Sequence, residues 1–187
     1  MNNTNMWRGD ELLILVDGDD NPIGPERRDK CHADAGLLHR AFSIYLFNSQ
    51  GQLLIQRRSK HKQLWAGYWA NSCCSHPLWG EQTETAAQRR LSDELGLSTP
   101  LNSIFKFKYS SRNEGFGSET ELCTVFIGKS DQVGVVDPNE IEEWKFIDPA
   151  VLDGYLLTNE GEYTPWLRIA WKTLRSEYWN DVQKMIG

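Results

Sequence analysis

The alternation of apolar and polar positions predicts several strands along the chain. Residues 11–17 read ELLILVD, a short apolar run typical of a strand, and GDDNPIG at 18–24 supplies the turn residues that end it. The runs AFSIYLFN at 41–48 and QLLIQRR at 52–58 predict a hairpin across the sequence Ser-Gln-Gly. Further strands are expected at IFKFKY (104–109), ETELCTVFI (119–127) and EWKFID (143–148).

One internal segment has the spacing of a helix. In TETAAQRRLSDELG the apolar residues Ala87, Leu91 and Leu95 recur every four positions, which places them on one face. Thr83 is the expected N-cap residue, and Gly96 is expected just beyond the C-terminus.

A last helix is expected near the end of the chain, opened by Thr164 and Pro165 and running from Trp166 to about Tyr178. Between the hairpin and the first helix lies an aromatic, glycine-containing loop, LWAGYWANSCCSHP. Strands and helices mix without strict βαβ alternation. We therefore expect an α/β fold of α+β-like character, a sandwich with a mixed sheet.

Length and charge limit the classes of function. The 187 residues fit one domain over 1–187, with residues 1–9 as a flexible tail. A formal net charge of -6 argues against general nucleic-acid binding, which depends on basic patches. No run of eighteen apolar residues occurs, and the start MNNTNMWRGDE lacks the features of a secretion signal. We expect a cytoplasmic protein with neither nucleic acid nor membrane as partner.

The segment NSCCSHPLWGE at 71–81 raises a chemical question, because two adjacent cysteines precede a histidine and a proline. The four cysteines are Cys31, Cys73, Cys74 and Cys123. Adjacent cysteines point in different directions, which makes a disulfide framework awkward, so free thiols are expected. The chain has no CxxC pair, which argues against a structural zinc site of the finger or ribbon type.

Five residues are capable of binding a metal. His32, His39 and His76 fall in loops or at element ends, and each alone is better explained as a surface or capping residue. Glu119 and Glu121, two apart on a strand, point to one face about 7 Å apart and repel unless a cation lies near. If the five converge, they form an N3O2 site that suits Mn²⁺, Zn²⁺ or a related ion. The sequence leaves their convergence open.

The helical segment GEQTETAAQRRLSDELGL resembles the Nudix box, in which a loop and a helix carry glutamates that bind Mg²⁺ against a diphosphate. The resemblance implies a Nudix-type α/β/α sandwich and matches Glu81, Arg89 and Glu94 to box positions. The chain departs from the box at Ser75, Arg90 and Asp93. Fewer acidic ligands imply that a diphosphate is held rather than hydrolysed.

Motifs along nearly the whole chain are similar to those of the type I isopentenyl-diphosphate isomerases. They are CHADAGLLHRAF, QRRSKHK, WAGYWANSCCSHP, the helix ending DELG, the strand ETELC and the late TPW. The resemblance implies an isomerase that interconverts isopentenyl and dimethylallyl diphosphate by a 1,3 proton shift through a tertiary carbocation.

The resemblance also implies the roles of individual residues. Cys74 and Glu121 match the opposed acid and base, Tyr109 a helper of Glu121, and Trp166 an aromatic that stabilises the cation. The matched metal-binding positions are His32, His39, His76, Glu119 and Glu121 for one tightly held Mn²⁺, Zn²⁺ or Mg²⁺, and Glu94 for Mg²⁺ arriving with the substrate; Cys74 is also placed in the metal set. The expected diphosphate contacts are Arg28, Arg58, Lys62 and Arg90.

Two other functions compete with the isomerase. A Nudix pyrophosphohydrolase would need more box glutamates and would not need Cys74. A non-catalytic binding module would keep Arg58, Lys62 and Arg90 but tolerate loss of Cys74 and Glu121. In the isomerase interpretation the partner is a small isoprenoid diphosphate, and the chain is a monomer or a homodimer.

Overall fold

The computed structural model describes residues 9–187, so the flexible tail expected at 1–9 lies outside the described part except for Gly9. The described strands are β1 (Leu12–Val16), β2 (Pro22–Arg27), β3 (His39–Phe47), β4 (Leu53–Arg58), β5 (Trp69–Ala70), β6 (Cys73–Ser75), β7 (Leu101–Asn113), β8 (Gly117–Lys129) and β9 (Ile141–Ile147). The helices are α1 (Arg28–Cys31), α2 (Thr83–Leu95), α3 (Pro149–Thr158), the 3-10 turn η1 (Glu160–Glu162), α4 (Pro165–Glu177) and α5 (Trp179–Ile186).

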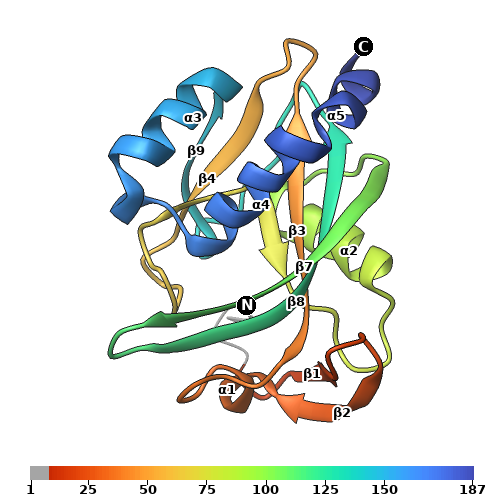
Figure 1. The fold of residues 1–187 in the computed structure, drawn as a ribbon, viewed down its shortest axis with the longest axis vertical. Coiled ribbons are helices and arrows are strands. Elements are labelled where there is room, and N and C mark those ends of the chain that lie inside the picture. The colour runs from red at the N-terminus through yellow and green to blue at the C-terminus, as the bar shows by residue number, and fades with distance from the viewer. Residues whose placement is uncertain (1–8) are drawn as a thin grey trace.

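Strand β3 is a central strand of a mixed sheet. It runs parallel to β8 over its whole length and antiparallel to β1, β4 and β6. Strands β7 and β8 form a long antiparallel hairpin that projects beyond the body of the sheet (Figure 1). The expected α/β sandwich with a mixed sheet is therefore confirmed.

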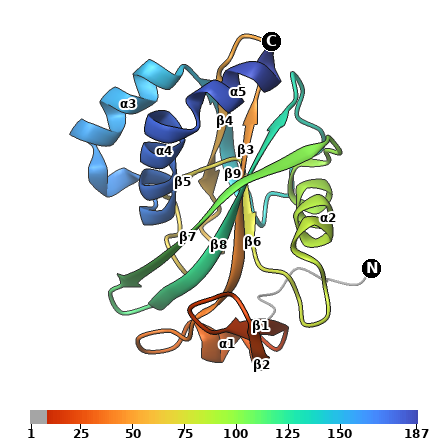
Figure 2. The same cartoon turned by 45° about the vertical axis from the view of Figure 1, so that its right-hand side comes forward.

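Helices cover both faces of the sheet, with α3, α4 and α5 on one side and α2 on the other (Figure 2). Side chains alternate along β3: Phe42 and Ile44 pack with α2, while Tyr45 and Phe47 pack with α4 and α5. Because both faces are buried, β3 reads as a nearly continuous apolar run in the sequence. We call these the α2 face and the α4 face of the sheet.

The hairpin expected at 41–58 opens as it leaves its turn. Strands β3 and β4 pair only at Phe47 and Leu53. The side chains of Asn71 and Ser72 fill the opening: Asn71 donates to the Ile44 carbonyl, and the Ser72 hydroxyl accepts from the Leu46 amide and donates to the Leu54 carbonyl. These buried polar side chains replace the missing backbone hydrogen bonds.

Helix α2 begins one residue differently from the prediction. Gln82 holds the N-cap position with no side-chain cap bond, so the assignment of Thr83 as N-cap is wrong and Thr83 is the first helical residue. Gly96 ends the helix at a φ of 60° as expected, because this left-handed conformation favours glycine.

The prediction of one domain over 1–187 stays a prediction. None of the helices in residues 9–187 combines the length and apolarity needed to cross a bilayer.

Candidate metal centre and active-site cavity

Strand register brings three of the predicted residues into one row on the α4 face. His39 at the start of β3 pairs with Glu121 of the parallel strand β8, and Glu121 pairs with Tyr109 of β7. Residues paired directly across strands share a face. The phenolic hydroxyl of Tyr109 consequently donates to Glu121 Oε2 at 2.7 Å.

The five candidate metal ligands converge. His32, His39, His76, Glu119 and Glu121 are all buried and offer ligand atoms within 4.8 Å of one another. Nε2 of His32 lies 2.9 Å from Glu119, and Nε2 of His76 lies 2.9 Å from Glu121. Cys74 and Glu94, which the resemblance also placed in the metal set, are not part of this cluster.

The outer ring nitrogens orient two histidines for metal binding. Nδ1 of His32 donates to the Arg28 carbonyl and Nδ1 of His39 to the Leu37 carbonyl, both at 2.7 Å, so both Nε2 atoms point inward. His39 Nε2 is buried without a hydrogen-bond partner among the described residues. His76 differs, because Arg28 donates to its Nδ1 while its Nε2 lies 2.9 Å from Glu121 Oε1. Together the three imidazoles and the two carboxyl groups offer an N3O2 donor set, which suits a divalent metal.

The buried groups of the cluster change one another's pKa values. Burial and the neighbouring His32 lower the pKa of His39 to about 4. Burial alone would raise the pKa of Glu119, but His32 lowers it to about 2. Burial and the charge of Glu119 raise the pKa of Glu121 well above its usual value. Two carboxylates this close therefore share an environment that a bound cation would stabilise.

The adjacent cysteines lie on opposite faces of the sheet. Cys73 packs in the core under α2, whereas Cys74 lies beside Tyr109 and Trp166 on the α4 face and lines the cavity. This separation follows from the alternation of side chains along β6. Burial raises the pKa of the Cys74 thiol to about 12, so the thiol is protonated near neutral pH.

Aromatic side chains form one wall of the cavity. Trp166, at the start of α4, meets Trp65 edge to face with ring centroids 5.3 Å apart. Its indole nitrogen donates to the buried Asn71 amide oxygen at 3.1 Å. The guanidinium of Arg58 lies 5.2 Å from the Trp166 ring centroid and donates to Cys74 Sγ at 3.8 Å. A cation is thus already accommodated against this ring.

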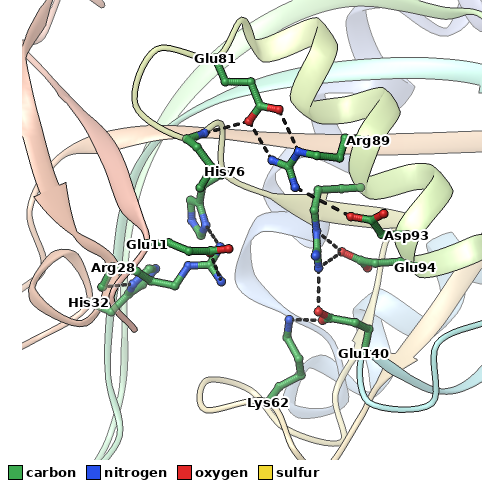
Figure 3. A network of polar contacts seen from close by, with 12 residues as sticks. Glu11, Arg28, His32, Lys62, His76, Glu81, Arg89, Asp93, Glu94 and Glu140 are labelled. Carbon is green, nitrogen blue, oxygen red and sulfur yellow. Dashed lines mark hydrogen bonds and ion pairs between the residues drawn. The ribbon is translucent and has the colours of Figure 1, made fainter. Parts of the chain in front are cut away.

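The four predicted diphosphate contacts line the same cavity. They are Arg28, Arg58, Lys62 and Arg90. They come from α1, β4, the loop after β4 and α2, so distant parts of the chain contribute them. Figure 3 shows Arg28 beside His76, and Lys62 beside Glu140. Four cations around one cavity attract a small multivalent anion.

The Nudix-box residues divide into two groups. Arg89 donates through two nitrogens to the two carboxylate oxygens of Glu81, and Glu81 also accepts from the Leu78 amide, so this pair holds the loop before α2. Arg90 instead pairs with buried Glu94 and with Glu140 (Figure 3). Glu94 therefore lies next to the cavity cations rather than in the histidine cluster.

Sequence reasoning missed two residues of this site. Asn71 stands inside the quoted segment NSCCSHP, but its spacing did not indicate that it would reach Trp166. Glu140 contacts both Lys62 and Arg90, yet it follows a loop without a motif. Its contacts depend on the packing of its own segment against the segments of Lys62 and Arg90, which are distant in the sequence.

The comparisons with known proteins agree with this architecture. A family model described as NUDIX domain matches residues 37–167. A protein of Deinococcus radiodurans has a similar structure, with a TM-score of 0.71 and 24% identity, covering 87% of this chain and 98% of that one. The MutT protein from Methanosarcina mazei gives a TM-score of 0.62 at 16% identity, covering 75% and 95%. These two likenesses concern the fold, which the family model identifies as that of a NUDIX domain.

Sequence relatives are more specific. The isopentenyl-diphosphate Delta-isomerase of Serratia proteamaculans is 43% identical over 165 residues, which cover 88% of this chain and 92% of the relative. The protein of that name from Halorhodospira halophila is 38% identical, covering 84% and 91%. Isopentenyl-diphosphate Delta-isomerase 1 of Mesocricetus auratus is 34% identical, covering 94% and 87%. The chain belongs to the Nudix superfamily and, within it, to the family of isopentenyl-diphosphate Delta-isomerases, which confirms the resemblance inferred from its motifs.

Proposed function

We propose that this protein interconverts isopentenyl and dimethylallyl diphosphate by moving one proton onto the allylic system and removing another. The observation that carries the proposal is that one cavity is lined by Cys74, Glu121, Tyr109 and Trp166 together with four basic side chains. An anion-binding end and an aromatic, proton-transferring end suit a substrate with a diphosphate head and a short hydrocarbon tail.

Cys74 and Glu121 act as the acid and base of the reaction. In one direction the Cys74 thiol gives its proton to the terminal alkene carbon, which leaves a tertiary carbocation. Glu121 then removes a proton from the neighbouring carbon on the diphosphate side, and the double bond forms in its new position. The reverse direction exchanges the two roles. Tyr109, hydrogen-bonded to Glu121 Oε2, holds the carboxylate and helps return its proton.

The cation requires a dry, electron-rich surface. The ring of Trp166 supplies it, and such a contact contributes about 2 kcal/mol or more when desolvated. The indole is fixed through Asn71, so its ring plane is set before the substrate arrives.

His32, His39, His76, Glu119 and Glu121 would hold one divalent ion, Mn²⁺, Zn²⁺ or Mg²⁺. When bound, such an ion would fix the orientation of Glu121 and lower its affinity for a proton. Glu94 is proposed to bind Mg²⁺ that arrives with the diphosphate. Arg28, Arg58, Lys62 and Arg90 bind the diphosphate oxygens through charge-assisted hydrogen bonds.

The test is incubation with isopentenyl diphosphate and Mg²⁺, followed by product analysis. We expect dimethylallyl diphosphate and no inorganic phosphate. Release of phosphate would instead identify a Nudix hydrolase. Tight binding without any product would identify a binding module.

A further inference from the structure

Glu140 lies between two of the cavity cations and has no part in the chemistry described above. One of its oxygens accepts from Arg90 at 2.7 Å and the other pairs with Lys62. All three side chains line the cavity. Burial alone would raise the pKa of Glu140, but Lys62 and Arg90 hold it well below its usual range, so the side chain is a carboxylate.

The backbone around Glu140 joins the two segments that carry those cations. Its carbonyl accepts from the amide of Ser59, and the Ser59 carbonyl accepts from the Lys62 amide. Three residues earlier, the amide of Asp137 donates to the carbonyl of Glu94 in α2. Glu140 is thus attached to the Lys62 loop and to the helix of Arg90 at once, and its own position is well defined.

The contacts of Glu140 with Lys62 and Arg90 leave N–H donors of both cations available for a ligand. An ammonium group has three N–H donors and a guanidinium five. Glu140 takes one interaction from Lys62 and one from Arg90, and Glu94 takes two hydrogen bonds from Arg90. The remaining donors can meet a diphosphate while the carboxylate stays in place.

We propose that Glu140 is a positioning residue that presents Lys62 and Arg90 to the diphosphate. This inference rests on the proposed function, because it takes a diphosphate as the ligand. Both cations have long, flexible stems, and holding them before the ligand arrives removes the cost of ordering them on binding. We expect the gain from that order to exceed the repulsion between one carboxylate and the diphosphate, because both cations already contact that carboxylate.

Direct binding tests the proposal without relying on turnover. The probe is inorganic pyrophosphate with Mg²⁺, titrated by calorimetry into wild-type protein, Glu140→Gln, Lys62→Met and the double variant. Glu142→Gln is the matched control, because it removes the same charge two residues away at an exposed position.

We expect Glu140→Gln to weaken pyrophosphate binding about 10-fold or more, and Glu142→Gln to bind as wild type does. In the Lys62→Met background the same change should weaken binding by less than about 3-fold, because one of the two positioned groups is gone. In the isomerase assay, the Michaelis constant should rise while kcat stays within about 3-fold. Tighter or unchanged binding by Glu140→Gln, or full additivity with Lys62→Met, overturns the proposal.

Two further results keep the test decisive. If Glu140→Gln fails to fold, Glu140→Asp replaces it, because the shorter side chain cannot reach both cations and the same outcomes apply. If wild-type protein isomerises the substrate but Glu140→Gln shows none of the expected losses of pyrophosphate binding, this inference is wrong and the proposed function stands. If Glu140→Gln shows the expected losses but wild-type protein does not isomerise the substrate, the proposed function is wrong and this inference stands.

Discussion

Replacing Asn71 with alanine is expected to destabilise the protein strongly, although Asn71 is not among the residues that line the cavity. The residue is fully buried and makes three hydrogen bonds. Its amide nitrogen donates to the carbonyls of Ile44 and Cys73, and its oxygen accepts from the Trp166 indole. Alanine removes all three and leaves buried polar groups without their partners.

The size of the effect follows from those three groups. A buried polar group that loses its partner costs about 1 to 3 kcal/mol, and some of this loss is recovered if water enters. We therefore expect Asn71→Ala to lower the free energy of unfolding by about 3 to 5 kcal/mol. For a chain of this length that corresponds to a melting temperature lower by about 6 to 20 °C.

Urea denaturation followed by far-ultraviolet circular dichroism measures the loss, with Asn102→Ala as the control. Asn102 is exposed on β7, so its replacement should stay within about 0.5 kcal/mol of wild type. A loss below about 1 kcal/mol for Asn71→Ala would refute the view that this side chain holds β3, β6 and α4 together.

The other predictions concern the chemistry. Cys74→Ala should lower kcat about 100-fold or more, while Cys73→Ala should have a mild effect; equal losses in the two variants would contradict their placement on opposite faces. Elemental analysis of purified protein should find one divalent ion per chain and a clear loss of metal in His39→Leu; full metal content in that variant would exclude the histidine cluster as the site. Arg90→Glu should raise the Michaelis constant about 10-fold or more without phosphate release, because it turns a cation into an anion beside the diphosphate; product analysis would detect efficient hydrolysis, which would refute this role.

Much of the fold could be predicted from the sequence because burial leaves a clear pattern. The runs at 41–48 and 122–127 are largely apolar on both faces, and they lie in the central strands β3 and β8. The spacing of Ala87, Leu91 and Leu95 matches the buried face of α2.

Elements without a clear apolar pattern were missed or shortened. The outer part of β7 reads Ser110–Asn113 and is largely exposed, so no alternation marks it as strand. Strand β6 is three residues long and lies inside a loop-like segment. Helix α3 was not predicted. The helix expected from Trp166 to about Tyr178 matches α4, whereas α5, which begins at Trp179, was not predicted.

The candidate site shows the same limit. Spacing alone indicated only that Glu119 and Glu121 share a face. The convergence of His32, His39 and His76 on them depends on strand pairing and loop packing, which single-sequence periodicity does not contain. The resemblance to the isomerase family named the five candidate metal ligands from the sequence alone. It did not indicate Glu140, whose contacts depend on the packing of distant segments.

The parallel pairing of β3 with β8 has a consequence for how the chain folds. Ser43 and Cys123 meet across it although 80 residues separate them. Contacts of such long range form slowly, because a large loop must close before any pairing stabilises it. During synthesis, His32 and His39 leave the ribosome long before Glu119 and Glu121 exist to meet them. The proposed metal site can therefore be complete only once about two thirds of the chain has emerged, which would make metal capture a late step of folding.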